Sequence, residues 1–114
     1  MPNNTADFRS EVTDWIKARM GEAAGASAAS RFFDAYDMLK SGIAHFWFTK
    51  KDGSVRSAYG TLDMGIVQRH GGTPKDKSGP KAFNGTVAYY DLEKDAWRCF
   101  YVDSVKEVDF EYGS

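Results

Sequence analysis

The sequence predicts an α+β fold in which two N-terminal helices precede a small five-stranded antiparallel β-barrel. The spacing of the apolar residues changes after Gly42 from about 3.6, the period of a helix, to about 2, the period of a strand. The second part of the chain also contains five short runs of β-branched and aromatic residues, each bounded by turn-forming residues. The length of 114 residues suits a single domain with one hydrophobic core.

The first helix is predicted over residues 5–20, because large apolar side chains recur there at three- to four-residue spacing. The side chains on this stripe are those of Phe8, Val12, Trp15, Ile16 and Met20. Residues 21–30 contain two glycines and no large apolar side chain. We interpret them as a linker, although their alanines leave a frayed helical continuation open.

The second helix is predicted over residues 28–41, and Gly42 stands where a left-handed residue would end it. Its apolar stripe consists of Phe32, Ala35, Tyr36 and Leu39. We expect this stripe to cover one open end of the barrel.

The first two strands are predicted over residues 43–49 and 54–62, joined by a hairpin turn at Asp52 and Gly53. Residues 68–82 are rich in glycine and proline and are expected to form a long loop.

Two further strands are predicted over residues 84–90 and 96–102, with a tight turn at 91–95 between them. Residues 103–105 are expected to form a single helical turn before a last short strand at 106–112.

This order of strands, loop and turn is typical of a small SH3-like or Sm-like barrel. Closure of the barrel would protect its strand edges, with the tryptophans inside and the lysines gathered on one rim. The predicted organisation is therefore a helical segment over residues 1–41 and a barrel over residues 42–114.

Three segments carry a resemblance to a known family: FTKKDGSVR at 48–56, YGTL at 59–62 and YDLEKDAWRCF at 90–100. From Gly42 to about Val108 the chain resembles the second WYL-like family, small Sm-like SH3-barrel proteins of bacteria and phages. The resemblance implies a regulatory ligand sensor, since the wider group is similar to sensors of nucleotides or single-stranded nucleic acid. Residues 1–41 lie outside the resemblance, and the chain has no recognisable helix-turn-helix domain.

The composition excludes several classes of protein. A net charge of −1 argues against binding of nucleic acid or an anionic membrane by overall charge. Any anionic ligand must therefore bind to a local patch of positive charge. The single cysteine, Cys99, excludes an intramolecular disulfide and a multi-cysteine zinc site. The polar N-terminus lacks the apolar run of a signal peptide or membrane span. We therefore expect a cytoplasmic location and no membrane partner.

The charge is unevenly distributed along the chain, which is the most informative functional feature. Residues 43–81 hold seven basic and three acidic side chains, whereas residues 82–114 hold three basic and seven acidic ones. The hairpin turn and the long loop can concentrate lysines where a phosphate backbone would bind, with Tyr59 as a stacking ring. The candidate nucleic-acid or anion-binding residues are Lys50, Lys51, Arg56, Tyr59, Arg69, Lys75, Lys77, Lys81 and Arg98. The alternative is a solvated loop beside an aromatic core.

Within this set Arg98 has a specific prediction, because adjacent strand residues point to opposite faces. With Trp97 in the core, Arg98 is exposed and can contact a phosphate or carboxylate through both guanidinium nitrogens. Its alternative role is a cross-strand salt bridge.

No catalytic or cofactor motif is found, so we predict a non-enzymatic protein with no cofactor and no metal. The glycine-rich residues 71–79 lack the order of a phosphate-binding loop, because Gly79 follows the lysine and Pro80 comes next. Cys99 is expected to be a small buried residue, and His45 to be packed or hydrogen-bonded.

Two functional hypotheses follow. The first is a binding or regulatory module that recognises single-stranded nucleic acid or a nucleotide-like anion through its basic loop. The second is a phage or mobile-element module that docks on a host protein through a barrel face or the first helix. The partner-binding residues would then be Phe8, Val12, Trp15 and Ile16. That stripe must pack either on its own barrel or on another chain, and a homodimer would also cover it.

Overall fold

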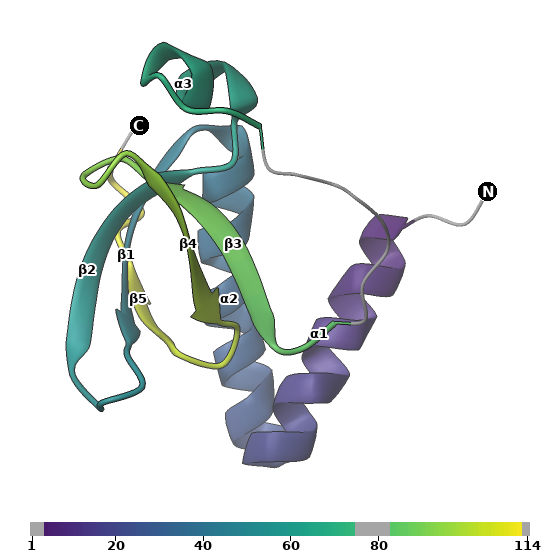
Figure 1. Cartoon of the computed structure of the whole chain (residues 1–114). Coiled ribbons are helices and arrows are strands. Elements are labelled where there is room, and N and C mark those ends of the chain that lie inside the picture. Colours follow the sequence, from purple (N-terminus) through teal and green to yellow (C-terminus); the bar gives the residue numbers. More distant parts are fainter. Residues whose placement is uncertain (1–3, 75–82, 113–114) are drawn as a thin grey trace.

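A computed structural model describes residues 4–74 and 83–112, together with side chains from Phe8 onward. Two helices lead into a curved antiparallel sheet, and a short helix lies between the second and third strands (Figure 1). The elements are α1 (Asn4–Met20), α2 (Glu22–Ser41), β1 (Ile43–Thr49), β2 (Val55–Thr61), α3 (Met64–Arg69), β3 (Thr86–Asp91), β4 (Ala96–Tyr101) and β5 (Val105–Val108). None of the described helices is long and apolar enough to cross a membrane.

The first helix is confirmed, but the predicted linker at residues 21–30 is wrong. Only Gly21 separates α1 from α2, and its φ of 90° is the left-handed conformation that turns the chain back. The small residues that follow allow the two helices to approach closely. A Cβ added at Gly25 would lie 2.7 Å from Lys17 Cα. The glycine–alanine segment is therefore a helix–helix contact.

The end of α2 differs from the prediction at Gly42, whose φ of 161° is extended and not left-handed. The helix carbonyls are satisfied instead by the end of β2. Leu62 N donates to Leu39 O at 2.8 Å, and Thr61 Oγ1 donates to Gly42 O at 2.6 Å. Long-range hydrogen bonds thus replace a local cap.

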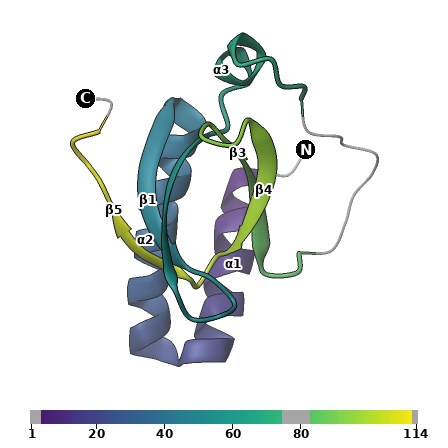
Figure 2. The same ribbon diagram turned by 60° about the vertical axis from the view of Figure 1, so that its left-hand side comes forward.

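The strands form one sheet in the order β4-β3-β2-β1-β5. The β1–β2 hairpin is confirmed, with Phe48 opposite Arg56 and a turn in which Gly53 has a φ of 90°. The strands curl around a common interior, as two views show (Figure 1, Figure 2). The predicted closure is not observed, because β4 and β5 are the two edges of the sheet and no strand ladder joins them within the described residues.

The sequence prediction missed α3. Asp63 begins this helix, its carboxylate accepting hydrogen bonds from Gly65 N at 2.8 Å and Ile66 N at 3.4 Å. Val67 is buried beneath the helix. The predicted loop therefore starts after α3 and not at residue 68, and residues 75–82 lie outside the described residues.

The last strand begins and ends earlier than predicted. The turn before β5 is closed by Ser104 N, which donates to Tyr101 O at 3.0 Å, so Val105 already belongs to the strand. Beyond the strand, Asp109 N donates to His45 O at 2.9 Å and the chain turns again at 109–112.

One hydrophobic core joins the helices to the sheet, with Phe32 of α2 packed 6.0 Å from the ring of Phe100. The apolar stripe of α1 belongs to the same core except for Met20, which is exposed. Val12 and Ile16 are fully buried, while Phe8 and Trp15 are half-buried against the ring of Phe83. The sequence left open whether this stripe packs on its own barrel or on another chain. The structure places it on the core of its own chain.

Candidate anion-binding site

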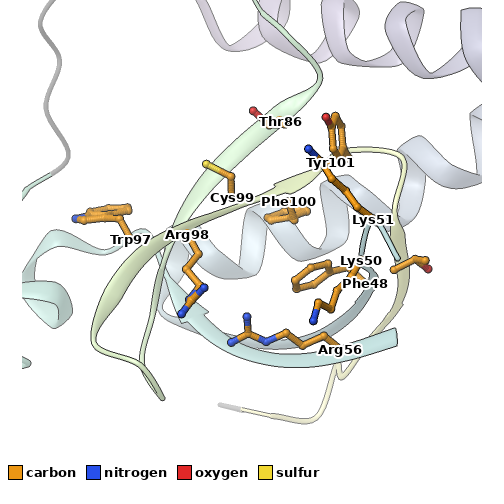
Figure 3. A pocket seen from close by; sticks show the side chains of 11 residues that line it. Phe48, Lys50, Lys51, Arg56, Thr86, Trp97, Arg98, Cys99, Phe100 and Tyr101 are labelled. Atoms are coloured by element: carbon orange, nitrogen blue, oxygen red, sulfur yellow. The ribbon is translucent and has the colours of Figure 1, made fainter. Parts of the chain in front are cut away.

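A cavity of about 440 Å³ opens between the β1–β2 turn and strand β4 (Figure 3). Its described lining consists of four cationic side chains, aromatic rings and small or polar residues, and none of these described residues carries a carboxylate. The lining residues are Phe48, Thr49, Lys50, Lys51, Arg56, Thr86, Trp97, Arg98, Cys99, Phe100 and Tyr101.

The centre of the site is an arginine pair held by one buried carboxylate. Arg56 Nη2 donates to Oδ2 of Asp91, and Arg98 Nε lies 3.7 Å from the same oxygen. The side chain of Asp91 is fully buried, whereas that of Arg98 is 46% exposed. Asp91 therefore holds the Arg56 guanidinium by a hydrogen bond and attracts that of Arg98 as an ion pair, which leaves most of their donors available.

The other oxygen of Asp91 is occupied by the β3–β4 turn. Oδ1 accepts hydrogen bonds from Glu93 N at 2.9 Å and Lys94 N at 3.2 Å. The carboxylate is thus held by local backbone hydrogen bonds in addition to its contacts with the arginines. The same hydrogen bonds explain why the chain turns after Asp91.

The β1–β2 turn adds two ammonium groups. Lys50 ends beside Arg56 and the ring of Phe48, and Lys51 extends toward Tyr101 (Figure 3). Lys51 Nζ is 6.0 Å from the centroid of the Tyr101 ring. Asp91 pairs with Arg56 and Arg98 alone, so the four cations of the described lining outnumber its one negative charge, and this excess suits a phosphate.

The floor of the cavity is aromatic. Phe48 and Phe100 are buried with ring centroids 5.7 Å apart, and Tyr89 packs against both. Burial raises the pKa of Tyr89 to about 12, so this ring stays neutral over the physiological range. The site therefore combines donors for an anion with an apolar surface for a ring or sugar.

Strand β4 faces the opposite way from the prediction. Arg98 is opposite Tyr89, whose side chain is inside the sheet, so Arg98 belongs to the concave face. Trp97 is only half-buried, and its Nε1 donates to Thr73 O at 2.9 Å. The expectation of Trp97 in the core is wrong, because the segment after α3 covers it instead. Trp15 and Trp47 are also half-buried and not inside the barrel.

Cys99 is a further correction, since its thiol is exposed on the edge strand and not buried. In the close-up it points away from the arginines (Figure 3).

The remaining predicted binding residues lie elsewhere. Tyr59 is on the outer face of the sheet and stacks on His45 with centroids 4.0 Å apart. Arg69 is at the end of α3, at the opposite end of the sheet from the β1–β2 turn (Figure 1). Lys75, Lys77 and Lys81 lie outside the described residues. The described part of the site is thus Lys50, Lys51, Arg56 and Arg98.

His45 is packed and hydrogen-bonded, as predicted. Its Nδ1 lies 3.2 Å from Asp109 Oδ2 and its Nε2 lies 2.9 Å from Ser57 Oγ. The hydrogen bond from His45 lowers the pKa of Asp109 below its ordinary value. These contacts hold the residues after β5 on the outer face of the sheet, away from the cavity.

Sequence reasoning missed Asp91, the residue that brings the arginines together. Its position at the start of a polar turn was the available signal, because aspartate there bonds to backbone two and three residues ahead. Its charge partners come from β2 and β4 and are visible only in the fold.

Comparisons with known proteins identify the family. A family model described as WYL_2, Sm-like SH3 beta-barrel fold, matches residues 33–106, from the second half of α2 into β5. Neither the curated proteins nor the solved structures gave a match. The family match covers strands β1 to β4, the start of β5 and all four cations of the cavity. With more than half of its length matched, this chain belongs to the WYL_2 family of Sm-like SH3 β-barrel domains.

Proposed function

We propose that this chain is a non-enzymatic binding module that holds a phosphate group of a nucleic acid or nucleotide-like anion in the cavity beside β4. The observation that carries the proposal is the pair of guanidinium groups, Arg56 and Arg98, that meet at the buried carboxylate of Asp91. Lys50 and Lys51 at the rim add charge without adding a carboxylate.

Arginine suits this task because its planar guanidinium presents several donors in a fixed geometry that matches phosphate oxygens. A free arginine loses side-chain entropy when it is ordered by a ligand. Here the hydrogen bond to Asp91 already restrains Arg56, so less side-chain entropy of Arg56 is lost on binding. The buried rings of Phe48 and Phe100 favour an anion that also carries a ring or sugar over a bare inorganic ion.

The test is binding of a fluorescent single-stranded oligonucleotide of about ten nucleotides, measured by anisotropy. If four cations contact phosphates, the logarithm of the affinity should fall with a slope of about −2.8 against the logarithm of salt. We therefore expect micromolar binding at about 50 mM salt that weakens about 50-fold at about 200 mM. A mononucleotide added in excess should compete.

The informative variant is Arg98→Glu, with Lys94→Glu as the matched control. Both changes alter the net charge equally, but Lys94 is exposed in the β3–β4 turn and does not line the cavity. We expect at least about a tenfold loss for Arg98→Glu and less than about a twofold change for Lys94→Glu. Absence of binding at about 50 mM salt, or equal losses in both variants, would contradict the proposal.

A further inference from the structure

A second cavity of about 540 Å³ adjoins the first on the other side of the β1–β2 turn. The two cavities share Thr49, Lys50, Lys51 and Tyr101 as lining residues. The two cavities therefore lie side by side, one toward β4 and the other toward the helices, with these four residues between them.

The second cavity extends the positive charge of the first. It adds three cationic residues, Arg19 of α1, Arg31 of α2 and Lys106 of β5. Its one carboxylate is that of Asp103, which lies 3.0 Å from Arg19 Nε. Together the two cavities contain seven of the chain's 15 lysines and arginines, although the whole chain has a net charge of −1.

Tyr101 lies where the two cavities meet. Its ring is half-buried and lines both cavities, and Lys51 approaches it from the turn. A half-buried tyrosine with a lysine beside it offers a stacking surface for a base whose phosphate the lysine can contact. Bases that are paired in a duplex cannot reach such a ring without leaving the stack.

From this arrangement, and resting on the proposed function, we infer that the ligand is a segment of single-stranded nucleic acid that spans both cavities. Its backbone passes from Arg98 over Lys50 and Lys51 to Lys106, with a base stacked on Tyr101. A single nucleotide would occupy one cavity and leave the cations of the other unused. Binding sites of about four or more nucleotides are usual for grooves of this kind.

The inference gives α1 and α2 a direct part in binding. Arg19 and Arg31 precede residue 33, so they lie outside the part of the chain that matches the family. Arg31 is held in place because its Nε donates to Val105 O at 2.9 Å. The helical hairpin therefore supplies one wall of the extended site.

The experiment compares oligo-dT ligands of about two, four and eight nucleotides at about 50 mM salt, with a duplex of the longest length beside them. We expect the affinity to rise with length until both cavities are filled. Lys106→Glu should weaken binding of the eight-nucleotide ligand by about five- to tenfold and reduce the magnitude of its salt slope by about 0.7. The same change should leave the dinucleotide within about twofold, whereas Arg98→Glu should weaken both ligands.

The outcomes separate the two proposals. Equal affinity for all lengths with no effect of Lys106→Glu would overturn the spanning ligand and leave the proposed function intact. Failure of every oligonucleotide and of a mononucleotide to bind would overturn the proposed function itself. Duplex binding as tight as single-strand binding would overturn the assignment to single strands. Lys106 is exposed, so the variant is expected to fold, and Lys106→Gln gives a milder change at the same position.

Discussion

At the scale of single residues, Asp91 connects the fold to the candidate site. One of its oxygens fixes the β3–β4 turn and the other meets two arginines, so a single buried carboxylate has four partners. A buried carboxylate without such partners would be strongly destabilising. The binding site and the stability of the sheet therefore depend on the same side chain.

Replacement of Asp91 by asparagine should lower the free energy of unfolding by about 3 kcal/mol, because it leaves the partly buried guanidinium of Arg56 without its counter-charge. Asparagine retains a side-chain oxygen that can accept the hydrogen bonds of the turn, so the loss of stability measures the effect of removing the negative charge. Urea denaturation measures it. Glu93→Gln removes an exposed carboxylate from the same turn and should change the stability by less than about 0.5 kcal/mol. Similar stabilities for the two variants would show that the arginine pair needs no buried partner.

Tyr89 makes the stability of the protein sensitive to alkaline pH. Its pKa is raised to about 12 by burial, whereas an unfolded tyrosine titrates near 10. Stability that is present below pH 10 should therefore be lost as the pH rises toward 12, by about 2 kcal/mol.

The measurement for Tyr89 is the urea midpoint between about pH 9 and 12, compared with that of Tyr89→Phe. The phenylalanine variant should lose less stability over this range. No described residue hydrogen-bonds the buried Tyr89 hydroxyl, so the variant should be at least as stable as the parent at neutral pH. Parallel pH curves for the two proteins would contradict the assignment of the titration to Tyr89.

At the scale of elements, the small residues at the start of α2 matter because they allow α1 and α2 to pack closely. Alanine at Gly25 would gain about 1 kcal/mol of helix propensity, but its Cβ would lie 2.7 Å from a backbone atom of Lys17. A backbone atom cannot move aside without shifting the helix. Crowding therefore outweighs propensity at this position.

We accordingly expect Gly25→Ala to destabilise the protein by about 1–3 kcal/mol in thermal or urea unfolding. Gly42→Ala is the matched control, since Gly42 is extended and a Cβ there meets nothing within 4 Å. That variant should be neutral or slightly stabilising. Increased stability of Gly25→Ala would mean that the helices do not pack as described.

At the scale of the whole molecule, one core makes the helices and the sheet a single unit. Val12 of α1 and Phe32 of α2 share a cluster with Phe46 and Phe100 of the strands. The helical hairpin is thereby fixed relative to the β1–β2 turn. This rigidity is what allows Arg31 and Lys106 to continue the basic surface that begins at Arg98.

Local patterns predicted much of this fold. The alternation of apolar residues in β1 and the Asp52–Gly53 turn identified the first hairpin with its boundaries nearly correct. The short helix α3 was not predicted because it has only six residues. The first part of α2 was not predicted as helix because its small residues form no apolar stripe. The candidate site was predicted in part, through Lys50, Lys51, Arg56 and Arg98.

By itself, the sequence determined the antiparallel strands, the first helix and the concentration of positive charge around the β1–β2 turn, because each depends on neighbours along the chain. Only the tertiary structure decided that Arg98 faces inward, that Asp91 joins it to Arg56, and that α1 packs on the chain's own core. These features depend on strand register and on contacts between distant segments. A shift of one residue in register would exchange Arg98 and Trp97 between the two faces of the sheet.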